Sequence, residues 1–118
     1  MRQIQFYKTH SGKSPVEEFL DALNAKQAKK VLWVLNLIES TNRVPREYFK
    51  KLSGTHDIWE VRIQSGSNIF RLLGFLYEGK IIILTNGFTK KSRKTPKNEI
   101  LIAEQRKTDF LSRKGDNQ

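Results

Sequence analysis

The side chains available for chemistry in this sequence are mainly those of lysine and arginine. The 118 residues include 22 Lys and Arg against 12 Asp and Glu, with two histidines and no cysteine. The lack of cysteine excludes disulfides, thiolate catalysis and cysteine-based zinc sites. His10 and His56 have no carboxylate cluster beside them, so we expect both to be surface or turn residues and expect no transition-metal site. What remains is cationic chemistry, above all the binding of phosphate.

Two arginines are predicted to face each other across a β-hairpin. Residues 59–64 alternate between apolar and polar side chains, and a four-residue turn separates them from a second strand-like run, 69–77. A loop of that length puts Arg62 directly opposite Arg71. Like charges in this position destabilise a sheet, so the pair is favoured where a phosphate lies between the two guanidinium forks. The alternative is that Glu60, diagonal to Arg71, neutralises that arginine as an ordinary ion pair.

The next hairpin brings a cationic segment toward the same arginine. A turn at residues 78–80 pairs the following strand so that Gly87 lies beside Arg71. The chain then leaves the sheet through residues 88–97, which contain no acid and five cations, Lys90, Lys91, Arg93, Lys94 and Lys97. An exposed Phe88 at the head of this segment could stack on a nucleobase while the cations follow a phosphate backbone. The alternative is a solvated loop without a ligand.

The first half of the chain predicts a strand followed by a helical hairpin. Residues 3–9 alternate loosely and indicate the strand. Ser14 can cap a helix whose first position is Pro15. Asn24 can cap a second helix, which ends at residues 41–45. The apolar stripe of this second helix is Ala28, Val31, Leu32, Leu35 and Ile38, widened by Val34 and Leu37.

The second half predicts three strands and a helix, which makes the domain α+β. The strands are residues 59–64, 69–77 and 81–88. The third is nearly all apolar and is expected to be central. Thr95 and Pro96 open a last helix, which we expect to pack on the sheet, with Arg106 and Lys107 as secondary phosphate contacts. The element order is β-α-α-β-β-β-α, an antiparallel sheet against a helical hairpin with a C-terminal helix.

Length and charge limit the domain organisation and the partners. We expect a single domain, residues 1–114, and a short disordered tail, residues 115–118. A net charge of +10 and a pI near 10.0 favour a polyanionic partner such as nucleic acid or an acidic protein. The alternative is a soluble protein with a solvated basic face. The longest apolar run, residues 81–84, is too short to cross a bilayer and no signal peptide precedes it, so we expect a cytoplasmic protein without membrane contact.

The order of several motifs resembles a known family. These motifs are W-E-x-R at residues 59–62, F-R-L at 70–72 and G-F-x-K-K-x-x-K-T-P at 87–96. An N-terminal S-P-V-E-E-F-L segment at 14–20 is similar to the same family. Together they resemble the phage-derived, HigB-type branch of the RelE/ParE toxin superfamily of type II toxin–antitoxin systems, over roughly residues 4–111. The RelE-like fold of that superfamily is the α+β arrangement expected above.

The resemblance implies a function and a set of site residues. It implies a toxin that inhibits translation as a ribosome-dependent mRNA endoribonuclease (an mRNA interferase, hence a hydrolase), without metal or cofactor. It also implies a cognate antitoxin, usually a helix-turn-helix protein, and binding of the pair to operator DNA. Arg71 matches the strand arginine that contacts the scissile phosphate, Arg62 the arginine of the preceding strand, and Lys90 and Lys91 the basic residues after the central strand. Asn86 departs from the family, since relatives often carry His there, and no tyrosine occurs in residues 88–98.

Metal-free cleavage of RNA requires deprotonation of the ribose 2′-OH, stabilisation of the phosphorane charge and protonation of the 5′-oxygen. We hypothesise that Arg71, with Arg62, clamps the phosphate. Lys90 or Lys91 would act as the acid or base, because neighbouring cations lower the pKa of a lysine. The other expected RNA-binding residues are Phe88, Arg93, Lys94, Lys97 and Arg106.

Two other functions remain open on the sequence. One is a catalytically inactive module that binds nucleic acid or the antitoxin. The other is a ParE-like inhibitor of gyrase. We expect Trp33 and Trp59 to be core or antitoxin-contact residues rather than base-stacking ones.

Overall fold

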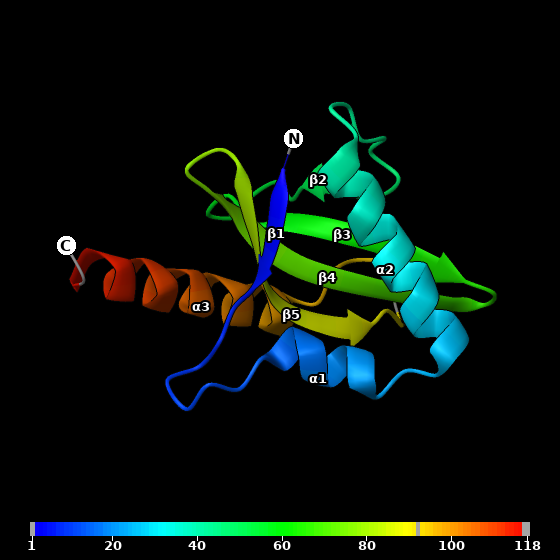
Figure 1. Cartoon of the computed structure of the whole chain (residues 1–118), viewed down its shortest axis with the longest axis horizontal. Helices are drawn as coiled ribbons and strands as arrows, with labels where there is room; N and C mark the ends of the chain where they lie inside the picture. Colours follow the sequence, from blue (N-terminus) through cyan, green and yellow to red (C-terminus); the bar gives the residue numbers. More distant parts are fainter. Residues whose placement is uncertain (1, 92, 117–118) are drawn as a thin grey trace.

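The sheet of this protein has five strands in the order β1-β5-β4-β3-β2 (Figure 1). The computed structural model describes residues 2–91 and 93–116. The elements are β1 (Gln3–Phe6), α1 (Pro15–Asp21), α2 (Ala25–Ser40), β2 (Phe49–Lys51), β3 (Trp59–Ser65), β4 (Asn68–Tyr77), β5 (Ile81–Thr89) and α3 (Lys97–Asp116). Only β1 pairs in parallel, with β5, while the other pairs are antiparallel. The expected α+β class is confirmed, and β5 lies inside the sheet as its apolar sequence predicts.

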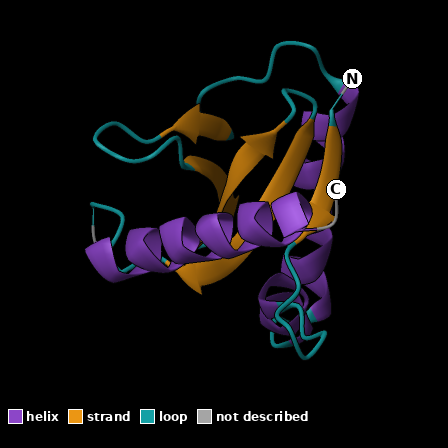
Figure 2. Ribbon diagram, turned by 90° about the vertical axis from the view of Figure 1, so that its left-hand side faces the viewer, coloured by secondary structure: helices purple, strands orange, loops and turns teal. Residues whose placement is uncertain are grey.

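The helices cover opposite faces of the sheet. In Figure 1, α1 and α2 lie across one face, and Figure 2 shows α3 running across the other. Apolar residues of α1 and α2 pack with one set of strand side chains, including Val61, Leu72 and Leu84. The face under α3 is formed by Ile58 and Leu73, which pack against Ala103. Burial on both faces holds β3, β4 and β5 rigidly, and these strands carry the candidate site.

The predicted starts of α1 and α2, two of the three helix starts expected from the sequence, are confirmed. The Ser14 hydroxyl accepts the backbone N–H of Glu17 at 3.2 Å, with Pro15 at the first helical position. Asn24 and Gln27 form a reciprocal capping box, in which each side chain accepts the backbone N–H of the other residue. These caps satisfy N–H groups that would otherwise be unpaired at the helix ends.

The buried stripe of α2 is narrower than its sequence suggests. Val31, Val34, Leu35 and Ile38 are buried, but Leu32 is 54% exposed. A helix turns by about 100° per residue, so Leu32 lies beyond the edge of a face centred on the other four. The inclusion of Leu32 in the apolar stripe was therefore wrong. Trp33, 51% exposed, lies still further round the helix, so of its two expected roles it does not have the one in the core, and the contact with an antitoxin stays a prediction.

The edges of the sheet differ from the predicted strands. β1 is shorter than the alternation over residues 3–9 indicates, and β2 was not predicted because three residues show no period. Phe49 of β2 is buried and stacks on Trp59, with ring centroids 4.7 Å apart. At the other end of the chain, α3 starts at Lys97 and continues through Asp116, two residues into the segment expected to be a tail. Residues 117–118 of that predicted tail lie outside the described part of the chain.

A β-bulge interrupts the pairing of β4 with β5. Gly74 pairs with Leu84, but Leu73 pairs with Asn86, so Thr85 is an extra residue in β5. The Thr85 hydroxyl donates to the carbonyl oxygen of Leu73 at 3.1 Å. A Cβ at position 74 would come within 2.2 Å of the Ile83 carbonyl oxygen, so the bulge requires glycine opposite it.

Candidate functional site

Arg62 of β3 lies directly opposite Arg71 of β4, as the length of the turn between the strands predicts. Paired residues of an antiparallel ladder point to the same side, and here that side is the one covered by α3. Arg71 is 5% exposed, and its Nη1 donates to the carbonyl oxygen of Phe70 at 3.2 Å. The side chain of Arg62 is 31% exposed. The hairpin therefore positions one buried and one accessible guanidinium group side by side.

Glu60 lies between the two arginines. Its Oε1 is 3.4 Å from Nε of Arg71 and 3.5 Å from Nε of Arg62, and its side chain is 2% exposed. Its Oε2 accepts a hydrogen bond from the hydroxyl of Thr95. The ion pair between Glu60 and Arg71, which the sequence analysis gave as the alternative, is thus present. The same carboxylate is also in ion-pair range of Arg62. Within the described residues both Nε atoms are buried without a hydrogen-bond partner, so Glu60 does not use up the donors of the pair.

The bulge brings Lys90 to the same face. The sequence prediction that Gly87 lies beside Arg71 is wrong, because the extra residue Thr85 shifts the register and pairs Arg71 with Phe88. The backbone N–H of Lys90 then donates to the carbonyl oxygen of Ile69 at 2.7 Å, which continues the same register by two residues. Since alternate residues of a strand share a face, Lys90 lies on the face of Arg71.

The three cations line one pocket. It has a volume of about 370 Å³ and is lined by Glu47, Tyr48, Arg62, Ile63, Gln64, Ile69, Arg71 and Lys90. A neighbouring hollow is lined by Ile69, Lys90, Lys91 and Arg93. Lys90 and Ile69 belong to both, so the cationic segment after β5 continues directly from the pocket. Five of the sequence-predicted residues therefore meet here: Arg62, Arg71 and Lys90 in the pocket, and Lys91 and Arg93 in the hollow beside it.

Burial and mutual repulsion shift the protonation of these groups. The pKa of Arg71 is lowered by burial and by Arg62, while Glu60 acts in the opposite direction. The pKa of Lys90 is lowered first by burial, then by Arg71, with smaller effects of Arg62 and Lys50, and Glu60 again opposes. Lys50 is involved because it pairs with Glu60 from the β2 side. The lowering expected for Lys90 thus arises from the strand arginines and from burial.

The remaining predicted residues lie outside the pocket. Phe88 packs in the cluster of Ile58, Leu73 and Ala103, so its predicted exposure at the head of the loop is wrong. Arg106 donates to the carbonyl oxygen of Thr85 at 2.8 Å, where it holds the bulge. Lys94 and Lys97 are exposed on the segment that leads to α3.

Asn86, the residue that departs from the family, is buried beside α3. Its side-chain amide donates to the backbone carbonyl and the carboxylate of Glu99, at 3.2 Å and 3.0 Å. The same side chain accepts the hydroxyl hydrogen of Thr85 at 2.6 Å. Asn86 therefore fastens β5 to the start of α3 and does not line the pocket of Arg71.

Tyr48 is the pocket residue that sequence reasoning missed. It directly precedes β2, and its carbonyl oxygen accepts the backbone N–H of Arg62 at 2.8 Å. Only the pairing of β2 with β3 brings it to the arginines, and a three-residue strand leaves no periodic signal. Its ring lies against that of Trp33, with centroids 6.0 Å apart.

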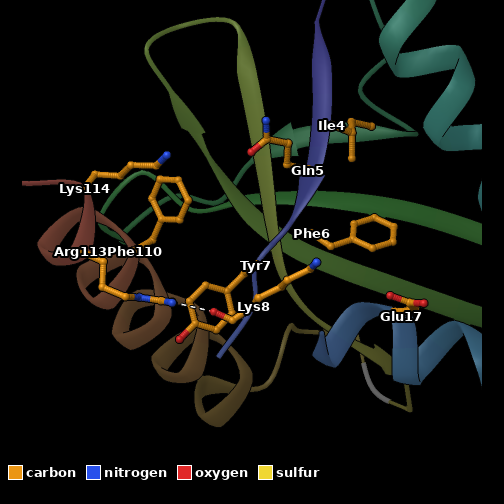
Figure 3. Close-up of a pocket in the computed structure, with 9 residues that line it drawn as sticks. All are labelled: Ile4, Gln5, Phe6, Tyr7, Lys8, Glu17, Phe110, Arg113 and Lys114. Atoms are coloured by element: carbon orange, nitrogen blue, oxygen red, sulfur yellow. Dashed lines mark hydrogen bonds between the residues drawn. The ribbon is translucent and has the colours of Figure 1, made fainter. Parts of the chain in front are cut away.

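A second, larger cavity lies at the other side of the molecule. It has a volume of about 650 Å³ and is lined by residues 4–8 along β1, Glu17, and Phe110, Arg113 and Lys114 of α3 (Figure 3). One of the charges beside it is paired, because Arg113 donates both to the Asp109 carboxylate and to the Lys8 carbonyl oxygen, each at 2.6 Å. This cavity contains none of the residues predicted to act on RNA.

The described residues include neither a group of side chains placed to hold a metal ion nor a helix that could span a membrane. In the described ranges, 2–91 and 93–116, no group of three or more His, Cys, Asp or Glu side chains is placed to hold a metal ion. Within the same ranges, no helix is both long and apolar enough to cross a membrane.

The fold and the site together define a RelE-like α+β domain with a cationic pocket at the end of its sheet. A family model described as "Phage derived protein Gp49-like (DUF891)" matches residues 18–108, and the chain belongs to that family. The family is part of the RelE/HigB-like toxins of toxin–antitoxin systems. A search of curated proteins found no match.

Proposed function

We propose that this protein is a HigB-type toxin that cleaves mRNA on the ribosome without a metal ion. The observation that carries the proposal is the meeting of Arg62, Arg71 and Lys90 in one pocket on one face of the sheet. Membership of a toxin family supports the toxin role. The chemistry of the pocket supports RNA phosphate as its target.

The charge balance of the pocket favours a bound anion. Three cations surround one buried carboxylate, Glu60, which is in ion-pair range of two of them. A phosphate entering beside Glu60 would relieve the repulsion between Arg62 and Arg71 and would bind both guanidinium forks. Because Glu60 and Thr95 already hold the buried side, the donors need little reorganisation when charge develops on the phosphorane.

Lys90 is the best candidate for the proton donor. Its lowered pKa makes its ammonium group a stronger acid than that of an ordinary lysine. In the proposed step the 2′-oxygen loses its proton to water and attacks phosphorus, the bond from phosphorus to the 5′-oxygen breaks, and Lys90 protonates that oxygen. The products are a 2′,3′-cyclic phosphate and a 5′-hydroxyl. Arg71 and Arg62 stabilise the negative charge on the phosphorane that forms after the attack and before the bond to the 5′-oxygen breaks. The ribosome aligns the 2′-OH for attack.

The rest of the cationic surface would hold RNA on either side of the reacting phosphate. Lys91 and Arg93 line the neighbouring hollow, and Lys94 and Lys97 follow on an exposed segment. We propose that these cations contact mRNA or ribosomal RNA. The proposed partners of the chain are the ribosome, an antitoxin of the helix-turn-helix type and, through the antitoxin complex, operator DNA, all in the cytoplasm.

The test is to map RNA ends after a short pulse of expression. We expect new 5′-hydroxyl ends within codons of translated mRNA, and little cutting of the same RNA without ribosomes. DNA damage without new mRNA ends would instead identify a gyrase inhibitor. Binding of RNA without any new ends would identify an inactive module, and either result would overturn the proposal.

A further inference from the structure

We propose that Tyr48 and Trp33 form an aromatic shelf that stacks nucleobases next to the phosphate pocket. The inference rests on the proposed function to the extent that it takes the anion in the pocket to be part of an RNA strand. The shelf would be a second binding element, outside the strands and the segment after β5, and it would bind the bases of the RNA and not its phosphates.

The shelf adjoins the pocket through Tyr48. Tyr48 is one of the residues that line the pocket, together with Arg62, Arg71 and Lys90. The Trp33 ring meets the Tyr48 ring edge to face, at 6.0 Å between centroids and 74° between planes. Since Trp33 is 51% exposed, the aromatic surface extends from the pocket outward to solvent.

The backbone fixes the shelf relative to the arginines. The pairing of β2 with β3 ends at Val61, and the Tyr48 carbonyl oxygen accepts the next available N–H, that of Arg62. The N–H of Tyr48 donates to the carbonyl oxygen of Pro45 at 2.9 Å. These bonds hold the Tyr48 backbone beside Arg62, and the Tyr48 ring lies against the Trp33 ring, so base and phosphate contacts would be made together.

Cations continue beyond the shelf on α2. A hollow lined by Lys26, Lys29, Lys30, Gln64, Ser65 and Gly66 shares Gln64 with the phosphate pocket. Lys30 Nζ lies 4.6 Å from the centroid of the Trp33 ring. Glu47 is the one acid that lines the pocket within the described residues, and it is exposed at the rim. The surface thus presents cations on both sides of two aromatic rings, the combination that binds single-stranded nucleic acid.

Phe88 does not line the phosphate pocket, which leaves Tyr48 and Trp33 to supply the stacking surface. Phe88 was the aromatic side chain expected beside the cations, but it packs against Ile58 and Ala103 under α3. Tyr48 is therefore the aromatic residue that lines the pocket in the described part of the chain. An RNA strand whose phosphate binds Arg71 has its neighbouring base within reach of that ring.

The experiment uses the fluorescence of Trp33 in the full chain with Trp59→Phe, a substitution that keeps an aromatic ring against Phe49. One probe is a single-stranded deoxyribonucleotide oligomer, which lacks the 2′-OH and is not cleaved. The other is an abasic oligomer of the same length and charge. We expect both to bind, and only the oligomer with bases to quench Trp33. Equal affinity for the two probes without quenching would overturn the shelf and leave the proposed function standing, whereas binding of neither would overturn both.

Variants of the shelf separate stacking from charge. We expect Trp33→Ala and Tyr48→Ala to weaken binding of the base-containing oligomer by about 5- to 150-fold, the range for loss of a stacking residue. Binding of the abasic oligomer should stay within about 2-fold, because the variants remove no charge. Leu32→Ala is the matched control, since Leu32 is 54% exposed on the same helix and should change neither affinity.

A protein partner for the shelf is the alternative outcome. If Trp33→Ala abolished the complex with the antitoxin while the oligomer affinities remained at the wild-type values, the shelf would be a protein-binding surface and the inference would be wrong. Tyr48→Phe adds a further check, because stacking requires the ring and not the hydroxyl. We expect it to bind the base-containing oligomer like the wild-type chain, and a loss as large as that of Tyr48→Ala would also contradict stacking.

Discussion

Among the described residues, two carboxylates form ion pairs with arginine side chains, and they differ in their hydrogen bonds. Asp109 of α3 accepts hydrogen bonds from the Tyr7 hydroxyl at 2.5 Å, from Arg113 at 2.6 Å and, on its other oxygen, from His10 at 3.1 Å. Glu60 of β3 has two arginines at 3.4 Å and 3.5 Å and accepts a hydrogen bond from the neutral hydroxyl of Thr95. The Asp109 carboxylate accepts hydrogen bonds on both oxygens, although Nε of Arg113 is buried without a hydrogen-bond partner in the described part of the chain, whereas the Glu60 carboxylate has two arginines beside it.

Burial deepens this contrast. The Asp109 side chain is 27% exposed, and its hydrogen bonds keep its pKa below the ordinary value, the bond from Tyr7 contributing most. Glu60 is 2% exposed, and burial lowers the pKa of its partner Arg71. Moving several like charges out of water is unfavourable unless an opposite charge joins them. The Asp109 cluster thus fastens α3 to the chain after β1, whereas we propose that the Glu60 cluster receives an anion.

The largest expected effect comes from removing one arginine of each cluster. Arg71→Ala should lower cleavage of mRNA on programmed ribosomes by about 10²- to 10³-fold, the usual loss for a donor to a transition-state oxyanion. Arg71→Lys should be intermediate, because it keeps the charge but not the fork. Arg113→Ala should cleave normally and lose only stability, read from a thermal melt. An Arg71→Ala chain that cuts ribosome-bound mRNA at the wild-type rate would contradict the proposed difference in role between the Glu60 and Asp109 clusters.

When each carboxylate is neutralised, the two variants should differ in how far inorganic phosphate restores their stability. Glu60→Gln should lower the free energy of unfolding by about 3 kcal/mol, because it leaves buried arginines without a counter-charge. Asp109→Asn should cost about 1 kcal/mol, since the site is partly exposed. Inorganic phosphate should restore stability to Glu60→Gln by binding the folded state, with little effect on Asp109→Asn. Denaturant titrations with and without phosphate measure this, and equal responses would contradict an anion site at Glu60.

The two clusters should also respond at opposite ends of the pH scale. Lys90 has a pKa below the ordinary 10.5, so its proton is lost, and cleavage falls, at a lower pH than for an exposed lysine. Lys90→Arg should remove this alkaline decline while lowering the rate. The pKa of Asp109 lies below 3.8, so its contribution to stability is present above that value and is lost as pH falls through the lower folded-state pKa. Asp109→Asn should flatten the acid limb of the unfolding curve and leave the pH–rate profile unchanged.

The smallest effects concern the neutral hydroxyl donors. Thr95→Val and Tyr7→Phe each remove one hydrogen bond to a carboxylate, and each should lower the free energy of unfolding by about 1 kcal/mol. Only Thr95→Val should also slow cleavage, by about 3-fold, because Glu60 then holds the arginines less firmly. Parallel melts and single-turnover cleavage assays make the measurement. If Tyr7→Phe slowed cleavage to the same extent, the slower cleavage would result from lower overall stability and not from a change at Glu60.

The sequence predicted the parts of this site that depend on local rules. The opposition of Arg62 and Arg71 follows from one turn length, and the helix starts follow from capping residues. The alignment of Arg71 with Gly87 failed because the bulge depends on Gly74, which admits the β5 backbone from the neighbouring strand. Tyr48 was missed because β2 exists only through its pairing with β3. Local patterns therefore predicted the β3–β4 register and the first two helix starts, whereas backbone contacts between strands decided the β4–β5 register and which side chains meet.

The extra residue in β5 has a further consequence, for the tolerance of this strand to changes in length. A chain lacking Thr85 would restore the regular register, and every side chain from Asn86 to the end of the strand would turn to the other face. Lys90 would then point toward the helical hairpin, away from Arg71, although the net charge of the chain would be unchanged. Deletions at this point should therefore separate the two cations as completely as substitution of either, while conservative replacements along the strand should be tolerated.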